Sequence, residues 1–316
     1  MQQFLQQLVN GTHLGATYAL IALGYTMVYG VLRLINFAHG DIFMLGAYAG
    51  LFAATGLGLA THASWGSVLL VILIAMVVAA LAGMATERFA YRKLRSALRL
   101  NALITAIGVS LLLEYGGQLP PMLHAGAVEV PFGTQIRAFP GSILPRADLP
   151  LGSITISSVQ LLTFVVAFAL MIVLELIVRR TRVGKAMRAV SSDREAAALM
   201  GIPTDRIISF TFALGSALAA AGGVLYALDK TYIDPLMGLY IGLKAFVAAV
   251  LGGIGSIPGA LIGGFVLGLT ETLVTGYGAG IGLNSTWRDA VAFGILILIL
   301  VVKPSGIMGS AAREKV

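Results

Sequence analysis

Two things are scarce in this sequence of 316 residues: it has no cysteine, and only 11% of its residues are charged. The absence of cysteine excludes disulfide bonds and thiolate metal sites. Soluble domains carry about 25% charged residues, so the small charged fraction argues against a soluble protein. Apolar residues replace charge, at 58% of the chain with a mean hydropathy of +0.92. This composition is typical of an integral membrane protein.

Apolar runs recur along the whole chain. A transmembrane helix needs about 20 mostly apolar residues. Runs of suitable composition cover residues 14–32, 42–60, 66–86, 101–118, 158–178, 207–227, 241–254, 258–275 and 286–302. The seventh and eighth runs are short and flank the break GGIGSIPG, and counting one of them as re-entrant leaves eight full spans instead of nine membrane segments. We expect an all-α integral membrane protein, a polytopic helical bundle in which residues 1–316 form one transmembrane domain.

The basic residues gather in three places, which accounts for the net charge of +7 without nucleic-acid binding. Fifteen of the 21 Lys and Arg residues lie in residues 88–99, 179–206 and 303–315. The positive-inside rule places all three in the cytoplasm, with the N-terminus outside and the C-terminus inside. Residues 119–157, rich in Pro and Gly, then form an extracytoplasmic loop with strand-forming residues near 154–156. The segments before and after the fifth would have opposite orientations, the layout of an inverted repeat, although the two halves share few letters.

The most polar stretch of the chain lies between the fifth and sixth apolar runs. Ser192 is a good helix N-cap, and Glu195 three residues later completes an S-x-x-E capping box. Asp193 adds negative charge at the positive end of the helix dipole, and Gly201 is placed to end the helix as its C′ residue. These signals predict a short cytoplasmic helix within about residues 185–202. Such a helix either lies in the lipid headgroups or inserts into a groove of a soluble partner.

Two further stretches interrupt the apolar pattern. In the first, polar residues and a glycine stand between the first two runs: Asn36, His39, Gly40 and Asp41. In the second, glycines, a serine and a proline interrupt a run that is otherwise long: Gly252, Gly253, Gly255, Ser256 and Pro258. Each stretch is either an ordinary turn at the membrane surface or a helix break that lines a transport path, where freed backbone groups bind a zwitterion. One His beside one Asp is too small a ligand set to indicate a metal site.

A few charged residues fall within or near the predicted spans. Lys244 and Glu271 either form an ion pair, reach the membrane surface or take part in function, and the pair or the surface is the better interpretation. With Glu114 and Glu175 they are the candidates for an ion relay, as a secondary ion-coupled transporter would require. We find no cluster of His and carboxylates and no nucleophile–base pair, which argues against a membrane-embedded enzyme.

Four stretches carry a family resemblance. They are, in chain order, GATYALIALGYTMVYGVLRLINFAHGD, ERFAYRKLR, VGKAMRAVSSDREAAALMGI and LKAFVAAVLGGIGSIPGALIGG. The third contains EAA, three residues and Gly201, which resembles the EAA loop of ABC importer permeases, although the Ile and Pro that follow in that pattern are not evident here. Taken together, the chain resembles branched-chain amino acid ABC transporter permeases of the LivH type.

The resemblance implies a type II-like ABC importer permease in the bacterial cytoplasmic (inner) membrane, a subunit without catalytic residues of its own. It would translocate leucine, isoleucine or valine, or, in other branches of the family, urea, amides or other amino acids. Its expected partners are a second permease of the LivM type or a second copy, two ATPase subunits of the LivG and LivF type that carry ATP and Mg²⁺, and a periplasmic or lipid-anchored binding protein. This chain would bind no cofactor.

The resemblance also implies two sets of functional residues. The set that would couple the permease to the ATPase comprises Gly184, Arg188, Ser192, Asp193, Glu195, Ala196, Ala197 and Gly201. The two breaks, with the residues named above, would lie near the translocation pathway.

Overall fold

The computed structural model describes residues 1–32, 36–61, 63–95, 98–116, 135–152, 154–282, 284 and 286–309. Much of the predicted loop over 119–157 lies outside the described residues, as does the end of the basic tail. Five of the described helices are long and apolar enough to cross a membrane, and shorter apolar helices accompany them. The prediction of an all-α, multi-pass membrane protein is confirmed.

The described chain is built almost entirely of helices. The α-helices are α1 (Gln2–Leu32), α2 (His39–Gly56), α3 (Trp65–Thr86), α4 (Arg99–Gly116), α5 (Ser158–Arg180), α6 (Arg182–Ser192), α7 (Arg194–Leu199), α8 (Thr204–Lys230), α9 (Met237–Gly252), α10 (Ile257–Tyr277) and α11 (Trp287–Val302). Each of the nine predicted membrane segments coincides with one helix among α1–α5 and α8–α11. The first helix starts well before the predicted segment. Its first residues, QQFLQQ, are mostly glutamines, which are too polar for the predicted apolar run but form helices readily.

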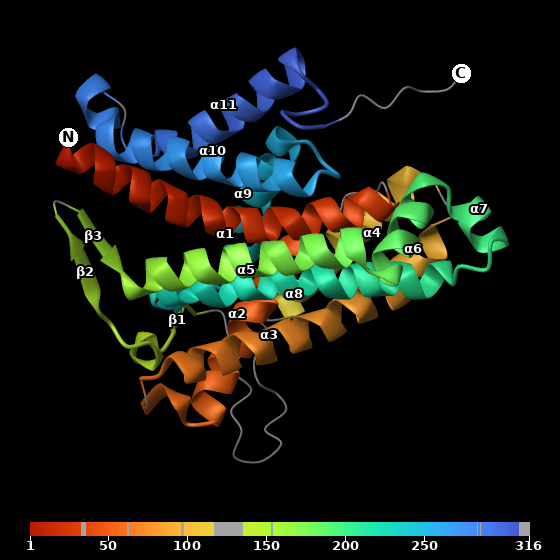
Figure 1. Ribbon diagram of the computed structural model, residues 1–316, viewed down its shortest axis with the longest axis horizontal. Helices are drawn as coiled ribbons and strands as arrows, with labels where there is room; N and C mark the ends of the chain where they lie inside the picture. Colours follow the sequence, from red (N-terminus) through yellow and green to blue (C-terminus); the bar gives the residue numbers. More distant parts are fainter. Residues whose placement is uncertain are drawn as a thin grey trace. The chain divides into compact units, whose positions relative to one another are not determined.

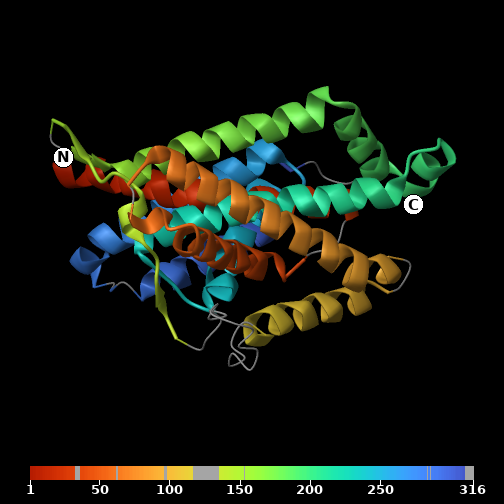
Figure 2. The same ribbon diagram turned by 90° about the horizontal axis from the view of Figure 1, so that it is seen from below.

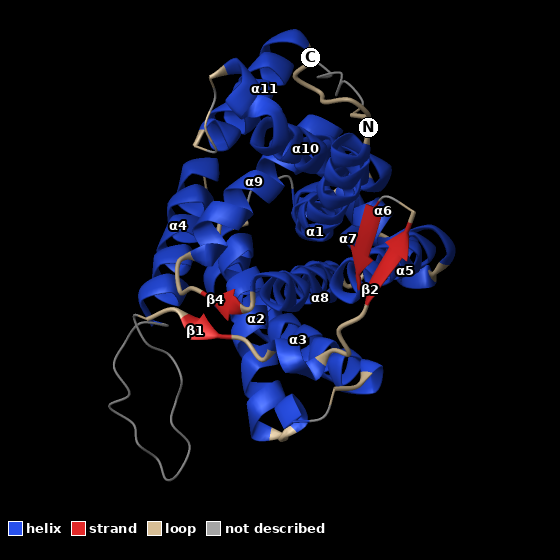
Figure 3. Cartoon of the chain, turned by 90° about the vertical axis from the view of Figure 1, so that its left-hand side faces the viewer, coloured by secondary structure: helices blue, strands red, loops and turns tan. Residues whose placement is uncertain are grey.

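Short elements connect these helices. They are the 3₁₀ turns η1 (Leu59–Thr61), η3 (Arg92–Leu94), η4 (Gly141–Ile143) and η5 (Gly278–Ile281), the π-helix η2 (Glu87–Tyr91), and the strands β1 (Arg137–Ala138), β2 (Asp148–Leu151), β3 (Ile154–Ser157) and β4 (Tyr232–Ile233). β2 pairs antiparallel with β3, Leu149 opposite Ile156, and β1 pairs antiparallel with β4, Arg137 opposite Ile233 (Figure 3). The expected strand near residues 154–156 is therefore confirmed as β3.

The contacts of the chain divide it into two compact units. Unit 1 comprises Met1–Arg33, Arg146–Thr204 and Leu243–Val316, and unit 2 comprises Leu34–Pro145 and Asp205–Gly242. Each unit is therefore assembled from segments that are distant in the sequence. The single transmembrane domain expected from the sequence stays a prediction.

In unit 1, α1 and α10 lie side by side with their backbones in contact (Figure 1). Glycines spaced four apart line both helices at this seam: Gly11 and Gly15 on α1, Gly264 and Gly268 on α10. A Cβ atom on Gly268 would lie 2.5 Å from the Cα of Gly15, and one on Gly15 would lie 2.7 Å from the Cα of Phe265. Small residues at this spacing let helix backbones approach closely in lipid, where apolar side chains gain nothing by leaving the acyl chains.

Unit 2 has the same close helix packing through small residues around α8, most of whose residues are buried. A Cβ on Gly46 of α2 would lie 2.5 Å from the Cβ of Ala220, and one on Gly83 of α3 would lie 2.8 Å from the Cβ of Ser216. Gly223, one turn further along α8, faces the backbone of α2. Small residues on α8 therefore allow α2 and α3 to pack directly against it.

We predict that Gly268→Leu destabilises the protein because its side chain has no space at the seam of α1 and α10. Overpacking of this kind costs about 1–3 kcal/mol, so the midpoint of thermal unfolding in detergent should fall. Gly108→Leu is the matched control, because a Cβ at Gly108 of α4 meets nothing within 4 Å. Equal midpoints for the two variants would contradict the close packing of this seam.

Candidate functional site

The polar stretch after α5 forms two helices where the sequence predicted one, and the predicted N-cap at Ser192 was wrong. α6 ends at Ser192 and α7 begins at Arg194, because Asp193 has an extended backbone with φ −152°. The Asp193 carboxylate accepts a hydrogen bond from the N–H of Ala196 at 2.9 Å. Asp193 is therefore the N-cap in place of Ser192, which completes the last turn of α6. Glu195 is then the second helical residue, so the predicted S-x-x-E box does not form.

The C-terminal end of α7 agrees with the prediction. Gly201 has φ +80°, a left-handed conformation that glycine adopts without strain. The N–H of Ile202 donates to the carbonyl of Ala197 at 3.1 Å, and that of Gly201 donates to Ala198 at 3.0 Å. This pair of bonds is a Schellman motif. Gly201 is confirmed as the C′ residue.

Two of the residues expected to couple the permease to an ATPase hold α6 against α5. Gly184 has no space for a Cβ because the carbonyls of Ile177 and Val178 lie directly against it. Arg188 donates a hydrogen bond to the carbonyl of Val178. The chain therefore folds back sharply from α5 into α6, as Figure 2 shows in green.

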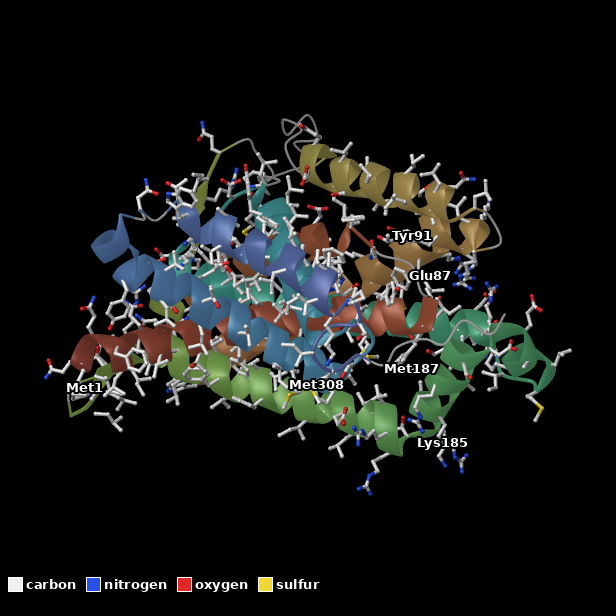
Figure 4. The ribbon with its side chains drawn as sticks, turned by 90° about the horizontal axis from the view of Figure 1, so that it is seen from above. Met1, Glu87, Tyr91, Lys185, Met187 and Met308 are labelled. Atoms are coloured by element: carbon white, nitrogen blue, oxygen red, sulfur yellow. The ribbon has the colours of Figure 1, made fainter. Side chains whose placement is uncertain are left out.

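α6 is also anchored to α1. The hydroxyl of Ser191 donates to the carbonyl of Gly30, near the end of α1. Met187 and Val190 are buried on the same helix, while Lys185 is exposed, and Figure 4 shows nitrogen-bearing side chains gathered around it. α6 is thus fixed to unit 1 on one side and presents basic residues on the other.

α7 is almost entirely exposed, with Ala197 its one buried residue within the described helix. Glu195 and Ala196 are exposed, as a docking surface requires. The two largest apolar side chains here, Leu199 and Met200, are 89% and 82% exposed. We did not predict them as functional residues. The signal in the sequence is a pair of large apolar residues directly before a C′ glycine, inside the most polar stretch of the chain.

In unit 2, the polar residues of the first break are buried and face other elements. Asn36 is 4% exposed and accepts a hydrogen bond from the hydroxyl of Tyr91 in η2 at 2.7 Å. Asp41, 1% exposed, lies in the first turn of α2, where the helix dipole favours a carboxylate. His39 is buried beside it. The break therefore forms a polar interior region of unit 2.

Asp41 belongs to a cluster with two residues of α4. The hydroxyl of Ser110 donates to Asp41 Oδ2 at 2.5 Å, and the carboxyl-bearing Glu114, 4% exposed, lies one turn further along α4. Gly40 permits the approach of α9, because a Cβ there would lie 2.9 Å from the Cα of Gly242. Sequence reasoning did not join Ser110 and Glu114 to this site. Their spacing of four, which puts both on one face of a helix, was the available signal.

A second polar cluster of unit 2 surrounds the π-helix η2. Glu87 is fully buried and pairs with Arg92 at 2.9 Å and with Arg95. Arg95 also pairs with Asp205 of α8 at 2.5 Å, and Ser209 donates to Glu87. Glu87 and Tyr91 lie on the same short segment in Figure 4. The start of α8, directly after α7, is thus fixed to unit 2.

The second break is a tight turn between α9 and α10 in unit 1. Gly253 and Gly255 have φ +102° and +97°, conformations that other residues rarely adopt. The hydroxyl of Ser256 accepts from the N–H of Gly259 at 3.2 Å and so caps α10, with Pro258 in its first turn. Gly252 contacts Gly259 backbone to backbone.

The chain after α11 packs on this turn. The N–H groups of Ile307 and Met308 donate to the carbonyls of Leu251 and Gly252, each at 2.9 Å. The turn thus receives backbone hydrogen bonds at the end of α9, where helix carbonyls otherwise lack partners. A role of either break in translocation stays a prediction.

Unit 1 also contains a network of charges around the buried residues Lys244 and Glu271. Lys244 Nζ lies 3.1 Å from Glu271 Oε1 and 2.7 Å from Asp289 Oδ1, which confirms the predicted ion pair. Arg288 lies 3.6 Å from Glu271, and the hydroxyl of Tyr18 donates to Glu271 at 3.0 Å. Two cations therefore balance two carboxylates within α9, α10 and α11.

Comparison with known families decides what kind of protein this is. The model of the family described as "Branched-chain amino acid transport system / permease component" matches residues 7–300. The chain belongs to this family.

Relatives within this permease family match over almost their whole length. The high-affinity branched-chain amino acid transport system permease protein LivH of Salmonella typhimurium is 42% identical, with 99% of this chain and 98% of the relative covered. BraD of Pseudomonas aeruginosa is 43% identical with the same coverage. A solved structure of PsaBC from Streptococcus pneumoniae in complex with Fab aligns with a TM-score of 0.46 and 13% identity, covering 96% of this chain and 92% of that one. Both relatives are permease components, and this chain is the membrane component of such a system.

We predict that the N-cap of α7 in this permease depends on Asp193. Asp193→Ala removes the cap, which costs about 0.5–2 kcal/mol, so amide exchange over Arg194–Leu199 should accelerate roughly 2- to 30-fold. Ser192→Ala is the matched control and should leave this exchange unchanged. Hydrogen–deuterium exchange with mass spectrometry checks both variants. Faster exchange in Ser192→Ala alone would restore the cap expected from the sequence.

We also predict that Lys244→Met destabilises the permease strongly, because it leaves the buried carboxylate of Glu271 without its nearest cation. Loss of one partner of a buried pair costs about 3–5 kcal/mol. Adding Glu271→Gln should recover part of this loss, which a double-mutant cycle of thermal unfolding in detergent measures. Strictly additive effects of the two changes would show that the pair is not coupled.

Proposed function

We propose that this chain is the transmembrane permease subunit of an ATP-driven importer in the bacterial cytoplasmic membrane, and that the importer carries leucine, isoleucine or valine. The observation that carries the proposal is the match to LivH and BraD at 42% and 43% identity over 99% of the chain. The fold agrees with it, because apolar helices make up most of the described chain and the short, capped and exposed α7 lies between two of them.

ATP hydrolysis belongs to partner subunits, of the LivG and LivF type, which carry ATP and Mg²⁺. α7 is the element that meets them. Leu199 and Met200 are suited to an apolar groove, the usual way in which a short helix binds a soluble partner. Asp193 and Gly201 fix the two ends of α7, so docking requires little ordering of the backbone.

The position of α7 in the chain suits a coupling element. α6 before it is fixed to unit 1 through Ser191 and Arg188, and α8 after it is fixed to unit 2 through Asp205. The chain passes from unit 1 to unit 2 at Thr204 and Asp205. A rigid displacement of α7 by its partner therefore acts on both units.

The other expected partners complete a translocation pathway. A second permease of the LivM type or a second copy forms the pore, and a periplasmic or lipid-anchored binding protein delivers the amino acid. Asn36, His39 and Asp41, with Glu114 beside them, are the polar groups in unit 2 best placed to receive the ammonium of a zwitterion. The turn over residues 252–258 serves the pathway from unit 1.

A secondary ion-coupled transporter is the second candidate. The observation that favours it is that two carboxyl groups, Asp41 of α2 and Glu114 of α4, are buried, since ionisable groups inside membrane segments often serve proton relays. An importer of the same family for urea, amides or other amino acids is the alternative for the substrate. The energy source distinguishes the ion-coupled transporter from the importer, and the substrate distinguishes the importers from one another.

The test is uptake of radiolabelled leucine, isoleucine, valine and urea into vesicles that contain this permease with its partner subunits. We expect branched-chain amino acids to accumulate with ATP inside the vesicles and not with a proton gradient alone. The double variant Leu199→Asp and Met200→Asp should bind the ATPase roughly 30-fold more weakly, because a buried apolar anchor contributes about 2 kcal/mol or more at such interfaces, and uptake should fall accordingly.

Leu57→Asp is the matched control, since Leu57 is 57% exposed directly after α2 and far in sequence from α7. It should leave ATPase binding intact. Accumulation by the permease alone, driven by a gradient and without nucleotide, would refute the ATP-driven mechanism. Normal coupling in the α7 double variant would refute the docking role of α7.

A further inference from the structure

A cavity of about 280 Å³ opens between α5 and α10 in unit 1. Its lining is apolar except for Glu175, and consists of Met171, Ile172, Glu175, Leu176, Ile257, Pro258 and Leu261. Both helices are long and apolar enough to cross a membrane. The cavity lies toward the C-terminal end of α5 and at the first turns of α10. An apolar cavity at this position in a span is suited to a hydrocarbon chain.

Basic residues follow the cavity-lining residues in the last turn of α5. Ile172, Leu176 and Arg180 follow at intervals of four, which keeps them on one face of a helix. With a rise of 1.5 Å per residue, Arg180 lies about 6 Å beyond Leu176 along the axis. The apolar stripe of α5 therefore ends in a cation one turn past the cavity.

The charge at this end of the cavity is positive. Arg180, Arg182 and Lys185 are exposed. The one acid in the lining, Glu175, is paired with Arg179 at 2.5 Å, so it does not offset these three cations. No further Asp or Glu occurs in the sequence before Asp193.

We propose that this place binds an anionic phospholipid, with one acyl chain in the cavity between α5 and α10 and the headgroup phosphate held by Arg180 and Arg182. Guanidinium groups bind phosphate oxygens with paired hydrogen bonds. Basic residues at the cytoplasmic end of a membrane helix attract anionic lipids. The charge favours a lipid over an apolar helix of another subunit, because a helix would leave these cations without counter-charge. The proposal requires that the chain spans a membrane and does not depend on the substrate.

Lipid binding to the purified full-length chain tests the proposal. Native mass spectrometry with phosphatidylglycerol and phosphatidylcholine in the same detergent measures the two affinities. We expect phosphatidylglycerol to bind more tightly, and Arg180→Gln with Arg182→Gln to reduce this preference roughly 30-fold. Arg146→Gln is the matched control, an exposed arginine before β2, and should leave the preference unchanged. Equal binding of both lipids to the unaltered chain overturns the headgroup assignment.

Two further variants test the cavity itself. Leu261→Trp fills the cavity and should weaken binding of both lipids at least tenfold, whereas Val165→Trp, on an exposed part of α5, should not. Unchanged binding in a correctly folded Leu261→Trp variant overturns the acyl-chain assignment. Because the chain has no cysteine, the purified Leu261→Cys chain takes up a single photoreactive label before it is assembled with its partners. A crosslink to phospholipid supports the proposal, and a crosslink to a polypeptide overturns it.

Discussion

Unit 1 depends on the direct backbone contact between α1 and α10. A bilayer offers no hydrophobic force that would bring two apolar helices together, so close approach must supply the attraction. The contact also places polar groups: Tyr18 lies three residues after Gly15, and Glu271 three residues after Gly268. The hydrogen bond of 3.0 Å between Tyr18 and Glu271 therefore crosses the same seam. A side chain at either glycine would separate the helices and the polar pair together.

The buried charged groups of the two units have different kinds of partner. In unit 1 Lys244 lies between Glu271 and Asp289, so opposite charges offset much of the cost of leaving water. In unit 2 the buried Asp41 accepts a hydrogen bond from Ser110, and the buried Glu114 lies one turn further along α4. Asp41 is thus paired with a hydroxyl instead of a cation, so it lacks the compensation that Lys244 supplies to Glu271 in unit 1.

The sequence predicted the membrane segments well because each depends on a local property, a run of apolar residues. It also predicted the left-handed Gly201 and the pair of Lys244 with Glu271. It failed at Ser192, where two adjacent residues were equally good caps and the extent of α6 decided between them. The partners of Asp41 come from α4, and only the fold brings these helices together. Gly184 carries no sequence signal for its role, because the carbonyls that exclude a side chain there belong to the end of α5.

The arrangement around α7 bears on the proposal that an element of six residues transmits force from a partner subunit. A helix this short is not stable alone, and its ends must be fixed by other means. Asp193 and Gly201 supply hydrogen bonds at both ends, while Ser191 holds α6 in unit 1 and Asp205 holds α8 in unit 2. If α7 is the coupling element that we propose, force applied at Leu199 would act on a helix whose two ends are fixed. It would reach the end of α1 through Ser191, and it would reach Glu87 of η2 through Asp205 and Arg95.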